Sequence, residues 1–362
     1  EILFVQPKNP AVELWSGRRM GVDMAGRLLG IQAVLPNTAF SDMSLTFKEF
    51  DKITYTPLSS GMQDDPRDRG DLSSLYKHFR EKISPVSASV DVVFLHDKLA
   101  AMRQVKQQEE LNLMIKAIDI TCNAHRELMK AVEPGMYEYQ AQAIIEYKFK
   151  TGGAEHPAFE SICGSGENTC VLHYSTNRRQ LNMGDLMVVD VGAEYHGYCA
   201  DVTRTIPVSG TFSNDQKLIY EIVLAAQKAG IAQCRAGKKF WEPNDAAKEI
   251  IANGLLQLGI IHSKSEYHKY FMHGTSHYLG LDVHDVGQFN YLMKGNVITV
   301  EPGIYIPEGS DCDQRWWNIG VRIEDDVLIT GGEPEVLSSS APKEITAVEE
   351  LMRQTSPLRP VH

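Results

Sequence analysis

The sequence lacks long hydrophobic runs, basic tracts and closely spaced cysteine pairs, and each absence excludes a class of protein. The apolar runs of this 362-residue chain fall far short of the ~20 residues that a membrane-spanning helix needs, so we expect no membrane partner. The formal net charge of −11, from 36 Lys and Arg against 47 Asp and Glu, disfavours a nucleic-acid partner. A hydrophobic content of 43% excludes an intrinsically disordered chain.

Six cysteines without a CxxC pair are typical of reduced thiols, so we expect a cytoplasmic protein. No signal peptide is visible. The first residue is Glu1 rather than Met, so we expect that the true N-terminus is missing or processed. A dinucleotide fingerprint, a phosphate-binding loop and a GxSxG nucleophile elbow are also absent.

The pattern of apolar runs predicts two domains. Residues 1–103 are expected to form a small N-terminal α/β domain, incomplete at its start, with strands at residues 2–5 and 90–95. The polar stretch 61–70 between them is expected to be a surface loop. The charged run 103–110 is expected to open the second domain, residues 104–362.

The second domain contains a coarse internal repeat. A helical stripe at four-, three- and four-residue spacings begins it, formed by Leu111, Ile115, Ile118 and Cys122. A second helix is expected at 137–150, followed by strands up to Pro207. Helices at 217–234 and 245–258, again followed by strands, repeat the order. A pseudo-symmetric α+β domain fits this pattern, although many α+β chains show coarse similarity of this kind.

Two aspartates lie in a predicted β-hairpin. If its turn centres on residues 195–196, Asp190 and Asp201 are directly opposite each other, with Cβ atoms ~5 Å apart. Carboxylates that close repel each other unless one is protonated or a cation lies between them. Strand-end aspartates often cap turns instead, but Asp190 follows the apolar run 186–189, where an uncompensated charge is costly. We therefore favour a metal site.

Histidines and glutamates add further candidate ligands. His273, His277 and His284 fall within twelve positions, although lone histidines are often structural. The segment 273–277 lacks the glutamate of an HExxH zinc motif. Glu301 and Glu324 interrupt apolar, β-branched strands, and a buried glutamate is rare unless it is paired or binds a metal. Pairing with Arg322 could explain Glu324 but leaves Glu301 unexplained.

Two Asp, one His and two Glu form an oxygen-rich ligand set. Such a set suits a pair of Mn²⁺-like ions better than a thiolate-bound zinc or an iron–sulfur cluster.

The candidate ligands, taken in their order along the chain, resemble those of a known family. In sequence order, the five metal ligands of the pita-bread (creatinase-like) metallopeptidases match Asp190, Asp201, His277, Glu301 and Glu324. Within that group, residues 271–287, 164–174 and 300–305 closely resemble aminopeptidase P, the Xaa-Pro aminopeptidase. The similarity covers most of residues 100–350 and, more weakly, the segment around residues 13–21, and the first domain is expected to be shorter than is usual for the family.

The resemblance implies a hydrolase that removes the first residue from peptides with proline at position two. Two divalent ions would activate a bridging hydroxide; Mn²⁺ is the expected metal, with Co²⁺ or Zn²⁺ as possibilities. Glu301 would be the general base, and His173, His273 and His284 would line the site. His173 or His284 would stabilise the intermediate or help to protonate the leaving proline nitrogen. Arg322 would lie near the substrate.

Relatives of this type are commonly oligomers, so a homodimer or homotetramer is expected. In it, Trp15 helps to shape a substrate entrance, although Trp15 could instead be partly buried core. A prolidase, which cleaves only Xaa-Pro dipeptides, remains the nearest alternative function. A non-catalytic binding protein and a metal-free amidinohydrolase of the same fold fit the complete ligand set less well.

Overall fold

The structure, a computed structural model, describes residues 1–58 and 71–359. It divides into two compact units, Glu1–Lys98 and Leu99–His362. The surface loop expected at 61–70 lies outside the described residues.

The first unit is small and mixes helices with a short parallel sheet. Strand β1 (Leu3–Val5) pairs in parallel with β2 (Val34–Pro36), which confirms the strand expected at the chain start. The α-helices that lie wholly within this unit, among the described residues, are α1 (Pro10–Ser16), α2 (Gly21–Leu29) and α3 (Leu72–Ile83).

The strand predicted at residues 90–95 is wrong, because a helix, α4 (Val92–Arg103), begins there. One carboxylate oxygen of Asp91 accepts hydrogen bonds from the backbone N–H groups of Val93 and Phe94, at 3.2 and 3.0 Å. An aspartate in this position satisfies otherwise unpaired donors of a helix start. The capping geometry therefore outweighs the β-branched composition of the run.

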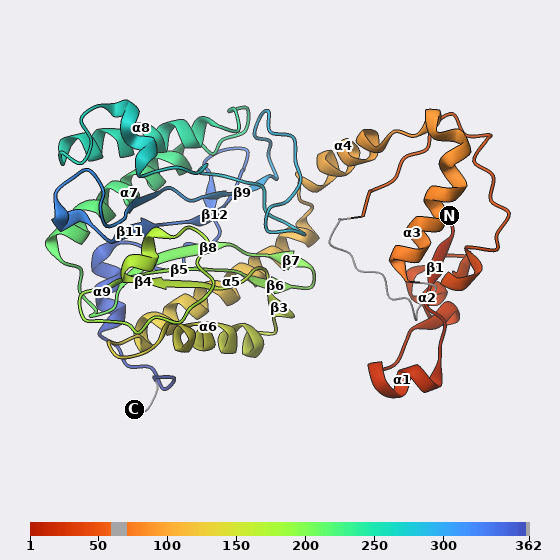
Figure 1. Ribbon diagram of the computed structural model, residues 1–362, viewed down its shortest axis with the longest axis horizontal. Coiled ribbons are helices and arrows are strands. Elements are labelled where there is room, and N and C mark those ends of the chain that lie inside the picture. The colour runs from red at the N-terminus through yellow and green to blue at the C-terminus, as the bar shows by residue number, and fades with distance from the viewer. Residues whose placement is uncertain (59–70, 360–362) are drawn as a thin grey trace. The chain divides into compact units, whose positions relative to one another are not determined.

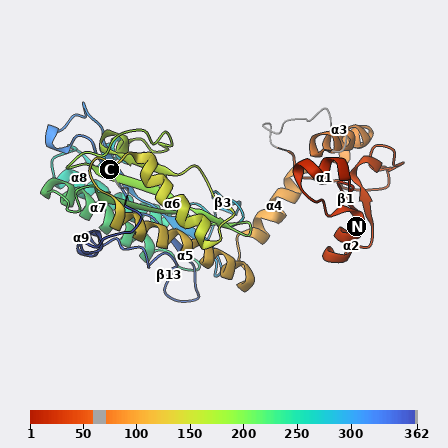
Figure 2. The same ribbon diagram turned by 90° about the horizontal axis from the view of Figure 1, so that it is seen from below.

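The second unit consists of strands between two pairs of helices (Figure 1). The pair α5 (Gln108–Ala131) and α6 (Glu138–Gly152) lies against one side and runs side by side in the view from below (Figure 2). The pair α7 (Asn214–Ala232) and α8 (Glu242–Gln257) lies against the other. A short helix, α9 (Ile345–Met352), follows near the end of the chain.

The strands fall into two sets that follow the two helix pairs in sequence. The first set is β3 (His156–Pro157), β4 (Ile162–Ser165), β5 (Leu186–Val191), β6 (Ala193–Tyr195), β7 (Tyr198–Cys199) and β8 (Val202–Pro207). The second is β9 (Val297–Val300), β10 (Gly303–Ile306), β11 (Ile319–Arg322), β12 (Asp325–Leu328) and β13 (Glu335–Val336). Each set thus follows one helix pair, as the repeat in the sequence predicts.

The long helix α5 forms where the apolar stripe predicts it. A capping box between Gln107 and Glu110 begins it. Leu111, Ile118 and Cys122 of the stripe are buried, and Ile115 is half-buried. Ile118 and Cys122 pack in a buried cluster with Val202 of β8, and Leu111 packs in another with Cys199 of β7, so this face of α5 lies against the hairpin that carries Asp201.

The hairpin forms as predicted, but its register is shifted. Asp190 pairs with Thr203, not with Asp201, because the turn centres on His196 and Gly197. These residues have φ angles of 49° and 87°, and a two-residue hairpin turn of this kind needs positive φ at both positions. Since side chains alternate with a period of two, this register still leaves Asp201 on the same face as Asp190.

Among the described residues, no helix combines the length and apolar character needed to cross a membrane.

Candidate metal centre

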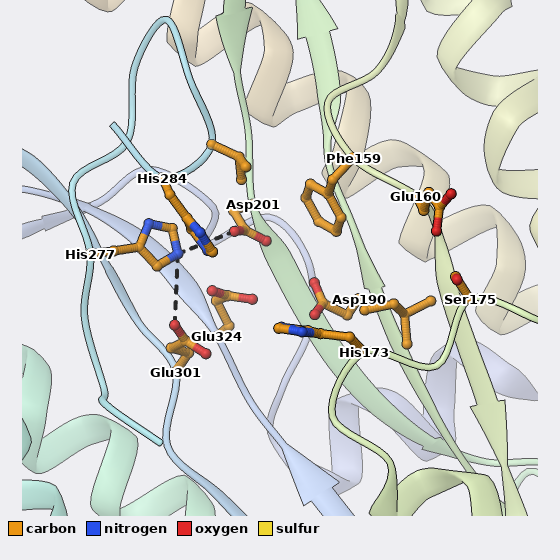
Figure 3. A pocket seen from close by; sticks show the side chains of 12 residues that line it. Phe159, Glu160, His173, Ser175, Asp190, Asp201, His277, His284, Glu301 and Glu324 are labelled. Atoms are coloured by element: carbon orange, nitrogen blue, oxygen red, sulfur yellow. Dashed lines mark ion pairs between the residues drawn. The ribbon is translucent and has the colours of Figure 1, made fainter. Parts of the chain in front are cut away.

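A pocket of about 330 Å³ collects the acidic residues that the sequence singles out (Figure 3). The first half of the domain contributes Asp190 from β5 and Asp201 from just before β8. The second half contributes His277, Glu301 directly after β9, and Glu324 between β11 and β12. All five side chains line this one pocket.

Three of the five can reach a single ion. One ligand atom each of Asp201, His277 and Glu324 lie within 4.8 Å of one another. His277 Nε2 is 3.4 Å from Asp201 Oδ2 and 3.7 Å from Glu301 Oε1. Its Nδ1 lies 3.0 Å from the backbone oxygen of Tyr278. That contact suits an Nδ1–H donor, which leaves the Nε2 lone pair facing the carboxylates, as metal-binding histidines require.

Asp190 offers one oxygen for a cation. Its Oδ2 accepts a hydrogen bond of 2.6 Å from Arg322 Nη2, whereas its buried Oδ1 has no hydrogen-bond partner in the described part of the chain. Buried carboxylate oxygens are rarely left without a partner. An unsatisfied oxygen on a carboxylate that shares its pocket with three other proposed ligand carboxylates therefore fits a bound cation.

The electrostatics of the pocket support the same conclusion. Burial and the neighbouring carboxylates, foremost Glu324, raise the pKa values of Asp201 and Glu301 well above their usual range. Burial, followed by the charge of Asp190, raises the pKa of Glu324 to about 8. Burial lowers the pKa of His277 to about 4 and keeps its imidazole neutral. Divalent cations would remove the repulsion, so the residues present fit a metal centre.

These pKa values predict that Mn²⁺ stabilises the protein more at pH 8 than at pH 5. Without metal, Glu324 has a pKa of about 8 in the folded state against an ordinary value of about 4.3 when unfolded. Its favourable contribution is therefore complete at low pH and is lost as the pH rises towards 8. The increase in Tm on adding Mn²⁺, measured by calorimetry, should be several degrees larger at pH 8. An equal increase at both pH values would contradict this.

The three candidate histidines lie around the acidic cluster. His284 packs edge-on against His277, with ring centroids 4.4 Å apart. His173 lines the same pocket from the segment after β4. His273 Nε2 is 2.8 Å from the hydroxyl of Tyr305, and its Nδ1 is 3.7 Å from Glu301 Oε2. Burial lowers the pKa of His273 to about 4, so this imidazole is neutral.

A second pocket of about 430 Å³ adjoins the first. The two share the walls formed by His173, Asp190, His277, His284 and Glu301. His273 and Arg322 line only the second pocket. Of the acidic cluster, Asp190 and Glu301 therefore border both spaces.

The expected pairing of Arg322 with Glu324 is not found in the described structure. Arg322 instead forms an ion pair with Asp190 of 2.6 Å and donates a 3.0 Å hydrogen bond to the Tyr305 hydroxyl. Glu324 Oε2 accepts a 2.6 Å hydrogen bond from Thr203. β11, which pairs with β10, ends at Arg322, and β12, which pairs with β9, begins at Asp325, so Glu324 lies between two strands and does not continue the strand face that the prediction assumed.

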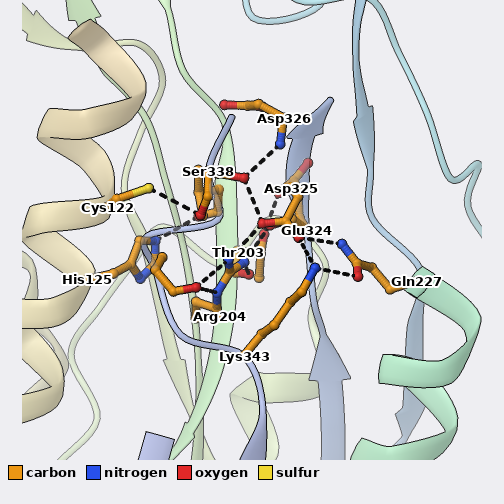
Figure 4. Close-up of polar contacts among 12 residues, drawn as sticks. Cys122, His125, Thr203, Arg204, Gln227, Glu324, Asp325, Asp326, Ser338 and Lys343 are labelled. Carbon is orange, nitrogen blue, oxygen red and sulfur yellow. Dashed lines mark hydrogen bonds and ion pairs between the residues drawn. The ribbon is translucent and has the colours of Figure 1, made fainter. Parts of the chain in front are cut away.

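A buried ionic network that the sequence did not reveal binds the backbone of Glu324 (Figure 4). Arg204 is fully buried and donates hydrogen bonds of 2.9 Å to the backbone oxygen of Thr203 and 2.5 Å to that of Glu324. It also pairs with Asp325 at 2.7 Å, and Lys343 binds the other oxygen of Asp325. Residues more than 100 positions apart meet here, which no local pattern in the sequence predicts.

Trp15 belongs to α1 of the first unit, and its side chain is 92% exposed. The alternative that it is partly buried core is therefore wrong for the structure described. Its expected place at a substrate entrance stays a prediction.

Comparison with known proteins identifies the family. Residues 112–331 match the model of metallopeptidase family M24, and residues 1–52 match that of the aminopeptidase P N-terminal domain. The chain belongs to metallopeptidase family M24. Its fold is the pita-bread fold, preceded by an aminopeptidase P N-terminal domain, as the sequence predicts, and it is a peptidase.

Named relatives narrow the comparison within M24. The chain is 37% identical to the Xaa-Pro aminopeptidase of Haemophilus influenzae, over 97% of this chain and 81% of that protein. It is 35% identical to the Xaa-Pro aminopeptidase of Escherichia coli, over 97% and 82%. The structure of Pseudomonas aeruginosa aminopeptidase PepP superposes with a TM-score of 0.87 at 33% identity, covering 97% of this chain and 82% of that one.

Proposed function

We propose that this M24 peptidase is a dinuclear-metal aminopeptidase that releases the first residue from peptides with proline at position two. The observation that carries the proposal is the convergence of four carboxylates and one imidazole on a single pocket, with an unsatisfied buried oxygen on Asp190. The similarity of the chain to named Xaa-Pro aminopeptidases, over 97% of its length, supports the proposed substrate class.

Two divalent ions, most simply Mn²⁺, would be held by Asp190, Asp201, His277, Glu301 and Glu324. When bound, such ions lower the pKa of a water molecule and polarise the peptide carbonyl. Carboxylates and one imidazole without thiolates favour Mn²⁺, and Co²⁺ or Zn²⁺ are alternatives.

Glu301 is the proposed general base. Its side chain is largely buried and lies within the proposed metal centre, where a carboxylate can take a proton from the attacking water and give it back. Its position between His273 and His277, at 3.7 Å from each, keeps it at the junction of the two pockets. The Glu301 carboxylate would thus accept a proton from the attacking water and pass it on towards the leaving nitrogen.

The histidines and Arg322 are proposed to hold the substrate. Tyr305 links His273 and Arg322 through its hydroxyl, at 2.8 and 3.0 Å, and so fixes both side chains along the second pocket. His173 and His284 lie where both pockets meet and would bind the carbonyl oxygen as its charge develops, or help to protonate the proline nitrogen. That nitrogen belongs to a tertiary amide and needs a proton to leave.

Three peptides test the proposed function. With Mn²⁺ present, the protein should release leucine from Leu-Pro-Ala and cleave Leu-Ala-Ala at least about a hundredfold more slowly, as judged by kcat/KM. The dipeptide Leu-Pro separates the alternative: a prolidase would cleave Leu-Pro and leave Leu-Pro-Ala intact. Mass spectrometry of the products identifies the bond that is cut, and preferential cleavage of Leu-Ala-Ala would contradict the proposal.

We also infer a homodimer or homotetramer in which the exposed Trp15 of one copy helps to shape a substrate entrance. An indole left 92% exposed in the described structure is of the residue type that interfaces bury.

A further inference from the structure

The acidic pocket extends beyond the proposed metal ligands. On the side away from His277, its wall is formed by Phe159, Glu160 and Ser175 (Figure 3). None of the three has a part in the proposed reaction. The chemistry of this wall can therefore be considered separately from that of the metal centre.

Glu160 differs from the other carboxylates of the pocket because it has no partner among the residues that the structure describes. Among the described residues, no cation and no hydrogen-bond donor contacts its exposed carboxylate. By contrast, its neighbours in the sequence are paired: Glu155 with His196 at 3.3 Å, and Glu167 with Arg179 at 2.8 Å. Bound cations would neutralise the ligand carboxylates, which leaves Glu160 as the uncompensated negative charge on the pocket wall.

The wall beside this charge is apolar. Phe159 and Val283 are half-buried, and Ile162 of β4 is buried; all three line the same pocket. Lysine and arginine side chains combine an aliphatic stem with a cationic head, so they cover an apolar wall and still place their charge beside a carboxylate.

Covalent geometry distinguishes the two cations that a peptide can present. The α-amino nitrogen is two bonds from the carbonyl carbon of its own residue, about 2.5 Å away, so in an aminopeptidase it must stay beside the reacting atoms. Glu160 lies on the opposite side of the pocket from His277, with Phe159 between Asp201 and Glu160 in the view of Figure 3. The α-amino group is therefore held beside the metal centre, whereas a long side chain can extend towards this wall.

We propose that this part of the pocket binds the side chain of the substrate's first residue, and that Glu160 makes the enzyme prefer lysine or arginine there. The proposal rests on the aminopeptidase function above. It assigns Glu160 a role in specificity and none in catalysis.

Arg-Pro-Ala and citrulline-Pro-Ala test it, because citrulline has nearly the shape of arginine without its charge. The wild-type enzyme with Mn²⁺ should favour the arginine peptide by about three- to tenfold in kcat/KM, the range expected for a partly exposed charge-assisted contact. In Glu160→Gln this ratio should fall to about one. In Glu160→Lys it should fall below one, and Glu-Pro-Ala should become better than Gln-Pro-Ala. Glu308→Gln, at an exposed carboxylate outside the pocket, should keep the wild-type ratio.

A wild-type ratio near one would overturn the proposal. So would an equal loss with both peptides in Glu160→Gln, because Glu160 would then contact a part that all substrates share, such as the α-amino group. Failure of the proline requirement is a separate result. If the enzyme cleaves Leu-Ala-Ala preferentially, the ratio is measured with Arg-Ala-Ala and citrulline-Ala-Ala, and it decides the role of Glu160 in the same way.

Discussion

Replacing Glu301 with alanine should lower kcat for Leu-Pro-Ala by at least about a thousandfold while the protein stays folded. General acid–base groups contribute ~10²–10⁴-fold to rate, and Glu301 is also a proposed metal ligand. Its side chain is 19% exposed and forms no hydrogen bond in the described structure, so its removal leaves no buried donor unsatisfied. Initial rates at saturating Mn²⁺, with Tm as the check on folding, measure the effect.

Two further variants serve as controls for Glu301→Ala. Glu301→Gln keeps the size of the side chain but cannot accept a proton, so it should lose nearly as much activity as Glu301→Ala. Glu308→Ala removes an exposed carboxylate outside both pockets and should leave kcat unchanged. Hydrolysis by Glu301→Ala within tenfold of the wild-type rate would refute the proposed role.

Removing divalent metal should abolish peptide hydrolysis, and adding Mn²⁺ should restore it. The ligands are four carboxylates and one histidine, and the six cysteines are free thiols outside the lining of the pocket. Without thiolates, divalent ions exchange more readily, so a chelator is expected to strip the site. Activity is measured after dialysis against a chelator and again after titration with Mn²⁺, with metal content from elemental analysis. Full activity in protein that contains no metal would contradict the prediction.

The sequence predicted the acidic cluster because its members break simple patterns. Asp190, Glu301 and Glu324 interrupt or end apolar, β-branched runs, and burial of a carboxylate in such a run requires compensation. Asp201 was expected opposite Asp190 from an assumed turn at residues 195–196. The turn centres one residue later because positive φ is required at His196 and Gly197. The sequence therefore predicted correctly that Asp190 and Asp201 share one face of the hairpin, but it did not predict the pairing of the strands.

Other features could not be predicted from local patterns. Asp91 converts an apparent strand into the start of α4 through two hydrogen bonds to the backbone, and composition alone does not reveal such a cap. Thr203 and Tyr305 support Glu324 and His273 from segments 121 and 32 residues away. Contacts across such separations depend on the packing of the whole domain, which periodicity does not describe.

The central claim is that Asp190, Asp201, His277, Glu301 and Glu324 together hold two metal ions. Anomalous diffraction near the manganese absorption edge, from crystals of this chain grown with Mn²⁺, tests it most directly. The account predicts two anomalous peaks per chain, both enclosed by these five side chains, with Asp190 Oδ1 turned towards one of them. A single peak, or peaks outside the cluster in crystals of active enzyme, would contradict it.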